Sequence, residues 1–156
     1  MTAAMQDTST GESIDMEQLY TFVTALRGGD FSARLPLQGG PRAIEIAMNL
    51  NRFAEQMGVL TGEVKRVCDE ISGGMLGGQV ELSLPPGPWR DCVESINLMG
   101  YAITDQVRDM SKSAKLLAEG KGMRPVTCRC DREMLELKNA LNVAIDNARS
   151  TKAPLV

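Results

Sequence analysis

The residues whose type and spacing come nearest to a chemical site are two cysteines, Cys128 and Cys130, separated by one residue. A C-x-C pair can hold a soft metal ion or form a redox couple, but zinc and thioredoxin sites use C-x-x-C spacing, and a second pair of ligands is missing. The chain has no histidine, which excludes Ser-His and Cys-His catalytic pairs, His-ligated metals and a phospho-accepting histidine. We therefore expect no catalytic residue, no metal site and no cofactor, and we keep a metal or redox role of this pair as the minor alternative.

Composition indicates helices instead of an aromatic-rich β core. The 156 residues are 43% hydrophobic and only 4% aromatic, with ten methionines. The net charge of −3 gives no reason to expect nucleic acid, and the chain has no basic block that would favour a membrane surface. Neither a signal peptide nor an apolar run of about 20 residues is present, so we expect a cytoplasmic protein.

A repeat with a period of about 45 residues organises the chain. Gly29, Gly74 and Gly120 are 45 and 46 residues apart, and the asparagines at positions 51, 97 and 142 are 46 and 45 apart. Such a period marks a repeated supersecondary unit, which is typical of architectural or relay proteins. Each asparagine follows an apolar position, so we expect it to lie beside a helix seam and to hydrogen-bond a connector.

Heptad spacing predicts helices that include residues 47–71, 89–119 and 134–148. Apolar or small residues recur there at alternating intervals of three and four, the pattern of coiled-coil packing. A lone chain has little else to cover such seams, so we expect a homodimer, with an intramolecular helical bundle as the alternative. The residues expected in the dimer seam are Leu50, Met57, Val64, Ile96, Ile103, Val107, Met110, Leu117, Leu137 and Leu141.

Three glycine- and proline-containing connectors separate the predicted helices, at residues 29–41, 74–88 and 120–132. Each is too long for a tight hairpin, because eleven extended residues reach about 36 Å, enough to return along one helix and start the next parallel to it. The residues expected to anchor the connectors are Gly29, Phe31, Leu35, Gly74, Leu76, Val80, Gly120 and Val126.

This plan resembles the HAMP signal-relay domain, and more closely the tandem poly-HAMP arrays of sensor and hybrid histidine kinases. EVKRVCDEI at 63–71 and GMLGGQ at 74–79 are similar to the EVxRVxxEV…GxLGGQ motif of those arrays. The segments that resemble the other motifs of these arrays are GPWRD at 87–91 with INLM at 96–99, TDQVR at 104–108, and EMLELK at 133–138 with Leu141-Asn142. The third copy departs from the pattern, with Lys121-Gly122 in its connector and Arg132 in place of glycine.

The resemblance implies an all-α fold of tandem HAMP units, each a parallel, coiled-coil-like four-helix bundle formed by a homodimer. The expected organisation is a disordered tail at 1–15, units at 16–60, 61–107 and 108–150, the last one degenerate and least stable, and a tail at 151–156. The implied function is non-catalytic relay of conformational change in a cytoplasmic sensor kinase or chemosensory-type system. The implied partners are a second copy and a histidine kinase or another signalling output domain, without nucleic acid or membrane. The alternative is a stand-alone helical scaffold or oligomerisation module that docks on a partner protein.

Overall fold

The computed structural model describes residues 13–120 and 123–152, and over these residues the chain is all-α, without a strand. The described helices are α1 (Met16–Arg27), α2 (Pro41–Ser72), α3 (Pro88–Ala118) and α4 (Arg132–Lys152). The all-α prediction is confirmed, and the bounds of α3 agree with the heptad pattern to within a residue. The last helix ends at Lys152, four residues beyond the end of the heptad run at position 148. Most of the predicted tails, residues 1–12 and 153–156, lie outside the described residues.

The repeat glycines terminate the helices that precede them. Gly29 and Gly74 both have φ +85°, the left-handed conformation that glycine adopts without steric cost. The N–H of the next residue donates to a carbonyl five positions back, Asp30 to Ala25 and Met75 to Glu70. This is the Schellman ending of a helix, and it explains the fixed place of glycine in the repeat.

The chain divides into two compact units, Met1–Arg66 and Val67–Val156. In the first unit, α1 packs beside the first part of α2 around a core of Phe22, Leu35, Ala47 and Ala54. The connector between them, residues 28–40, supplies Leu35 to that core. Asp15 caps the N-terminus of α1, and its side chain accepts from the N–H groups of Glu17 and Gln18.

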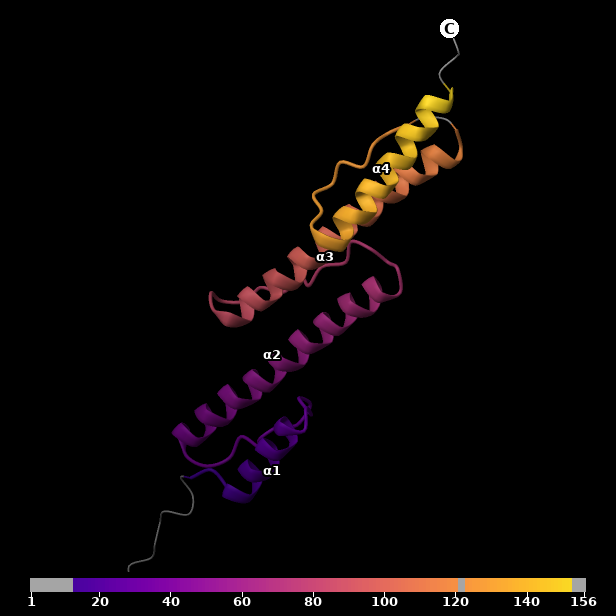
Figure 1. The fold of residues 1–156 in the computed structure, drawn as a ribbon. Helices are drawn as coiled ribbons and strands as arrows, with labels where there is room; N and C mark the ends of the chain where they lie inside the picture. The colour runs from indigo at the N-terminus through magenta and orange to yellow at the C-terminus, as the bar shows by residue number, and fades with distance from the viewer. Residues whose placement is uncertain (1–12, 121–122, 153–156) are drawn as a thin grey trace, which may run out of the picture. The chain divides into compact units, whose positions relative to one another are not determined.

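In the second unit, α3 and α4 lie side by side (Figure 1). Two connectors belong to this unit, the second connector (residues 73–87) and the third connector (residues 119–131, described apart from 121–122). A cluster of Met110, Val126, Cys128 and Cys130 forms the core between α3, α4 and the third connector. None of the described helices is long and apolar enough to cross a membrane.

The buried face of each long helix changes along its length. In α3, Val93 and Gly100 are buried in the first half, whereas Met110 and Ser113 are buried in the second. At 3.6 residues per turn, Ser113 faces about 160° away from Val93. Ala47 and Val67 in α2 have the same separation of 20 residues, and both are buried. The side of each helix that contacts its own chain therefore changes between its two halves.

The heptad run of residues 47–71 also includes Thr61 and Cys68, which are exposed in a single chain, whereas the preceding residues Leu60 and Val67 are buried. The contacts that bury Leu60 and Val67 therefore reach α2 from another side than the predicted dimer seam. The seam itself stays a prediction, because a second chain would cover it.

Candidate functional site: connector clamps and helix seams

Each repeat contains one asparagine that grips the connector beside it. In the first unit, the Asn51 side chain accepts from the N–H of Leu35 at 2.7 Å and donates to the carbonyl of the same residue at 2.8 Å. Leu35 is almost fully buried, so its peptide groups have no access to water and need such partners. We call this two-way contact an asparagine clamp.

The clamp recurs in both copies of the second unit. Asn97 binds the N–H and carbonyl of Val80 at 2.8 and 3.1 Å, and Asn142 binds those of Val126 at 2.8 and 3.2 Å. Both valines are buried. The prediction that the repeat asparagines hydrogen-bond the connectors is thus confirmed at all three positions, and it assigns these asparagines a structural role.

The clamps fix the direction of the helices. Along the third connector, Arg124 pairs with Asp109 and Arg129 accepts from Gln106, so the connector runs antiparallel to α3. Against α4, Met123 is bonded by Arg149 and Val126 by Asn142, so the connector also runs antiparallel to α4. Helices α3 and α4 therefore run in the same direction, as Figure 1 also shows.

Helix α3 is shared by two connectors that lie on different faces of it. Its first half carries the clamp to the second connector, and Gly100 lies where a Cβ would meet Ile71 at 3.2 Å and the Gly78 carbonyl at 3.7 Å. Its second half holds the third connector through Asp109 and Met110. One continuous helix thus belongs to two consecutive repeats.

The predicted connector anchors differ in burial and in contacts. Leu35, Val80 and Val126 are buried at the clamps, and Phe31 lies over Gly58, where a Cβ would meet the Phe31 side chain at 3.3 Å. Leu76 is half-buried, and its carbonyl accepts from Arg108 at 2.8 Å. Gly29, Gly74 and Gly120 have positive φ at the helix ends.

The predicted seam residues range from buried to exposed within one chain. Met57 and Met110 are buried, six others are half-buried, and Val107 and Leu137 are 37% and 52% exposed. The half-buried residues are Leu50, Val64, Ile96, Ile103, Leu117 and Leu141. In the second unit the seam residues of α3 and α4 meet at an open hollow of about 450 Å³, lined by Met110, Ser111, Ala114, Leu137 and Leu141.

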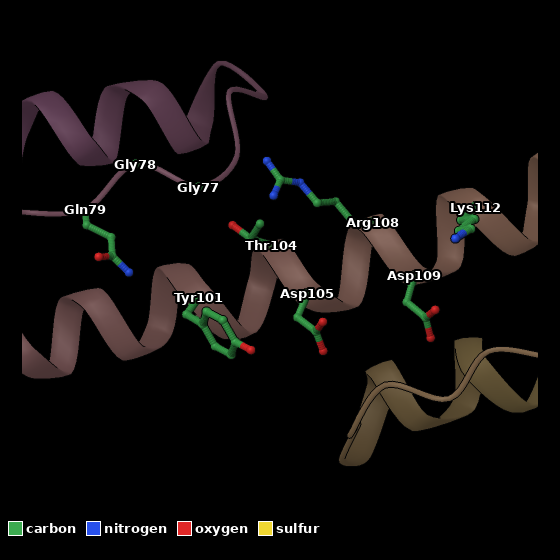
Figure 2. Close-up of a pocket in the computed structure, with 9 residues that line it drawn as sticks. All are labelled: Gly77, Gly78, Gln79, Tyr101, Thr104, Asp105, Arg108, Asp109 and Lys112. Atoms are coloured by element: carbon green, nitrogen blue, oxygen red, sulfur yellow. The ribbon is translucent and has the colours of Figure 1, made fainter.

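A second hollow, of about 400 Å³, lies where the second connector passes over α3 (Figure 2). Gly77 and Gly78 form one side, and Thr104, Arg108 and Lys112 are among the helix residues that line the other. Arg108 reaches back to the connector, while Thr104 donates to the carbonyl of Gly100 at 2.7 Å. The hollow lies between the second connector and α3, at the place where Gly77 and Gly78 have no side chains to fill the space.

Among the carboxylates of the site, Asp109 has the most strongly shifted pKa. It accepts from the Arg124 guanidinium at 2.5 Å and from the N–H groups of Thr127 and Cys128 at 2.7 and 2.8 Å. Burial by itself would raise the pKa of the Asp109 carboxyl. The two N–H groups and Arg124 outweigh that effect and lower the pKa to about 2.

Sequence reasoning missed this polar network of the third connector. Besides Asp109, Lys138 donates to the carbonyl of Cys128 at 2.8 Å and Gln106 donates to that of Arg129 at 3.0 Å. Charged residues at helix positions 109 and 138 look like ordinary solvated faces in the sequence. The available signal was the loss of apolar residues from the third connector, because a connector without them needs polar attachments.

Comparisons with known proteins leave the family open. No protein-family model matches the chain, and no solved structure matches it. The resemblance to poly-HAMP arrays therefore depends on the motifs in the sequence.

Proposed function

We propose that the chain is a non-catalytic signal-relay module of the poly-HAMP kind that works as a parallel homodimer. The observation that carries the proposal is the asparagine clamp, repeated three times with the same two hydrogen bonds. A clamp of this type holds an extended connector against a helix and so keeps consecutive helices parallel. Conformational relay requires such a repeated, directional connection between units.

The sharing of α3 by two connectors supports relay along the chain. A rotation or tilt of α3 that alters the packing at Val93 and Gly100 also alters it at Met110 and Ser113, since one rigid helix carries both faces. Helix shifts of about 1–2 Å are a known way to couple packed elements with two arrangements. Consecutive units would then exchange packings in sequence.

The exposed seam supports dimerisation. In the second unit, the hollow between α3 and α4 is lined by Met110, Leu137 and Leu141, which the heptad spacing assigns to the seam. Equivalent helices of a second copy would fill it and complete a four-helix bundle, with two helices from each chain. Burial of large apolar side chains such as Leu137 would contribute about 1.5–3 kcal/mol each.

The proposed relay would act on a histidine kinase or another signalling output domain. The alternative is a stand-alone scaffold that docks on a partner protein. Large exposed side chains outside the seam, such as Leu98 and Val143, are the observation that favours it. If Leu98→Ser and Val143→Ser abolish partner capture and leave the dimer intact, the scaffold function is favoured over relay.

Substitution in the seam tests the dimer. Ile103→Lys places a charge among apolar side chains, where an unpaired buried charge costs roughly 3 kcal/mol or more. We expect this variant to dissociate or to unfold the second unit, as measured by light scattering and circular dichroism. The matched control is Asp105→Lys, two residues away and exposed, which should remain dimeric. A compact wild-type monomer at micromolar concentration, or equal effects of the two substitutions, would reject the seam.

Oxidative cross-linking tests the parallel arrangement. Cys68 and Cys92 are exposed, whereas Cys128 and Cys130 are buried, so Cys92→Ser leaves Cys68 as the exposed thiol. In a parallel dimer each Cys68 lies near its counterpart, and mild oxidation should give a cross-linked dimer if disulfide geometry is reached. An antiparallel dimer keeps the two sites tens of Å apart, because Cys68 is near one end of α2. Spin-label distances at Cys68 decide the matter independently of disulfide geometry.

A further inference from the structure

The core of the third connector is rich in sulfur. Buried Cys128, Cys130 and Met110 form a cluster with Val126, and Met134 and Leu141 pack against it. Of the six described residues of this cluster, four carry sulfur. They come from three elements, since Met110 is in α3, the cysteines are in the connector and Met134 is in α4.

The preceding repeat has no sulfur at the positions that correspond to the two cysteines. Counted by the 46-residue offset between the second and third connectors, Cys128 and Cys130 correspond to Leu82 and Leu84. A purely apolar role is therefore met by leucine elsewhere in the same chain, and cysteine is not needed for it. The pair calls for a chemical explanation in addition to packing.

The two thiols face each other with their sulfur atoms 3.4 Å apart. A disulfide requires about 2.05 Å, so the pair would have to close by more than 1 Å. With metal–sulfur bonds of about 2.3 Å, two sulfurs on one tetrahedral ion lie about 3.8 Å apart, and on a linear ion about 4.6 Å. The observed separation is nearest to that of an ion with three or four ligands, which the two thioethers can complete.

We propose that Cys128, Cys130, Met110 and Met134 form a binding site for a single Cu(I) ion. Thiolate and thioether sulfurs are the soft ligands that select Cu(I). Among the described residues, no group of three or more His, Cys, Asp or Glu side chains is placed to hold a metal, so Zn²⁺ lacks its usual ligand set here. The ligand of this site is a soft monovalent ion. Its binding is a separate function from the proposed relay of conformational change by the helices.

Binding is coupled to proton release. Cu(I) binds cysteine as the thiolate, so a protonated thiol must lose its proton when it becomes a ligand. One Cu(I) displaces the two thiol protons and forms two copper–thiolate bonds, leaving the site with one net negative charge and the metal in its original oxidation state. The affinity for Cu(I) should therefore rise with pH, and Arg124 and Lys138 lie nearby to compensate the charge.

The experiment is an anaerobic titration of the full chain with Cu(I) held by a chromogenic chelator. We expect one equivalent to transfer to the protein, with sulfur-only coordination in the copper X-ray absorption spectrum. The double substitution C128L/C130L copies the second connector and keeps the core apolar, and it should weaken binding by more than about 100-fold because both anionic ligands are lost. The matched control C68S/C92S removes the exposed thiols and should bind like the wild type.

Other outcomes decide against the proposal. Equal Cu(I) binding by C128L/C130L and the wild type, or loss of binding in C68S/C92S, would place the metal at the exposed cysteines and overturn the site. M110L/M134L should lower the number of coordinating sulfurs, and an unchanged spectrum would overturn the assignment of the thioethers. The number of sulfurs around copper in the wild type tests the site even if C128L/C130L fails to fold.

Discussion

The second and third connectors occupy corresponding places in the repeat, yet different chemistry holds them. The second connector places Val80 at its clamp and follows it with Leu82 and Leu84, so apolar residues recur at every second position. The third keeps its clamp at Val126 but has cysteines at the next two of these positions. Polar side chains of both neighbouring helices then supply the remaining attachments.

The difference shows which part of the connector the fold requires. Two features are common to all three copies, the positive-φ glycine at the start of the connector and the clamp that satisfies the N–H and carbonyl of one buried residue. The rest of the connector can be held by apolar burial or by a charged centre such as Asp109. Charge-assisted hydrogen bonds are about twice as strong as neutral ones, so a few of them can replace several apolar contacts.

The third copy also contains two locally unfavourable features that the second copy lacks. Ser113 corresponds to Val67 by the repeat offset, and its fully buried hydroxyl has no hydrogen-bond partner within the described part of the chain. Arg132 has φ +48°, an uncommon conformation for a residue with a side chain. The expectation that this unit is the least stable remains a prediction, because the Asp109 network acts in the opposite direction.

Removal of the clamp asparagines should give the largest difference between the second and third connectors. Asn97→Ala leaves the buried N–H and carbonyl of Val80 without partners, a loss of about 2–3 kcal/mol. Asn142→Ala does the same at Val126, but Asp109 still holds the next two N–H groups. Hydrogen exchange should therefore accelerate along the whole second connector in the first variant, and mainly at Val126 in the second.

The two clamp variants serve as controls for each other. Each removes the same two hydrogen bonds at corresponding helix positions. If exchange at Thr127 and Cys128 in Asn142→Ala accelerates as much as exchange in the second connector of Asn97→Ala, the Asp109 network does not hold the third connector, and the comparison fails.

Acid should loosen the third connector through Asp109. Its pKa is about 2 in the folded chain against an ordinary value of 3.8, so its stabilising contribution is present above about pH 4 and is lost as the pH falls toward 2. The shift corresponds to at most about 2 kcal/mol, and we expect about 1 kcal/mol because Arg124 is partly exposed to solvent. Asp109→Asn should lower stability by that amount at pH 6 and should match the wild type near pH 2.

The control for this prediction is Asp105→Asn, an exposed carboxylate one turn earlier on α3. It should change neither the stability at pH 6 nor the acid transition. An unchanged acid transition in Asp109→Asn would show that other groups determine the acid response of this connector.

Period and spacing in the sequence predicted α2, α3 and α4, the helix-breaking glycines and the hydrogen bonds of the repeat asparagines to the connectors. These features depend on local rules, because glycine can take the positive φ that ends a helix at low steric cost and a sustained heptad is typical of a helix. The faces on which α2 and α3 change their contacts were not predictable in this way. Thr61 and Cys68 fit the heptad, but the burial of Leu60 and Val67 depends on how distant segments return to the helix.

The Asp109 network and the sulfur cluster were missed for the same reason. Asp109 and the N–H of Cys128 are 19 residues apart, and nothing in either local pattern indicates that they meet. The C-x-C pair was visible, but Met110 was assigned to the dimer seam, and position 134 served only as the start of a predicted helix. Only the return of the third connector between α3 and α4 brings these side chains together.

The smallest effect is expected where α4 begins. Gly87, just before α3, and Arg132, at the start of α4, are 45 residues apart, and both have positive φ, +147° and +48°. A residue with a Cβ in a left-handed conformation costs about 1–2 kcal/mol, which glycine avoids. Part of that gain is lost because glycine has more conformational freedom in the unfolded chain, so Arg132→Gly should stabilise the third unit by about 0.5–1 kcal/mol.

Thermal unfolding followed by circular dichroism measures the gain, with Arg132→Ala as the control that removes the charge but keeps the Cβ. If Arg132→Ala is stabilised as much as Arg132→Gly, the Arg132 side chain beyond its Cβ causes the destabilisation. The positive φ would then not explain a difference in stability between the starts of α3 and α4.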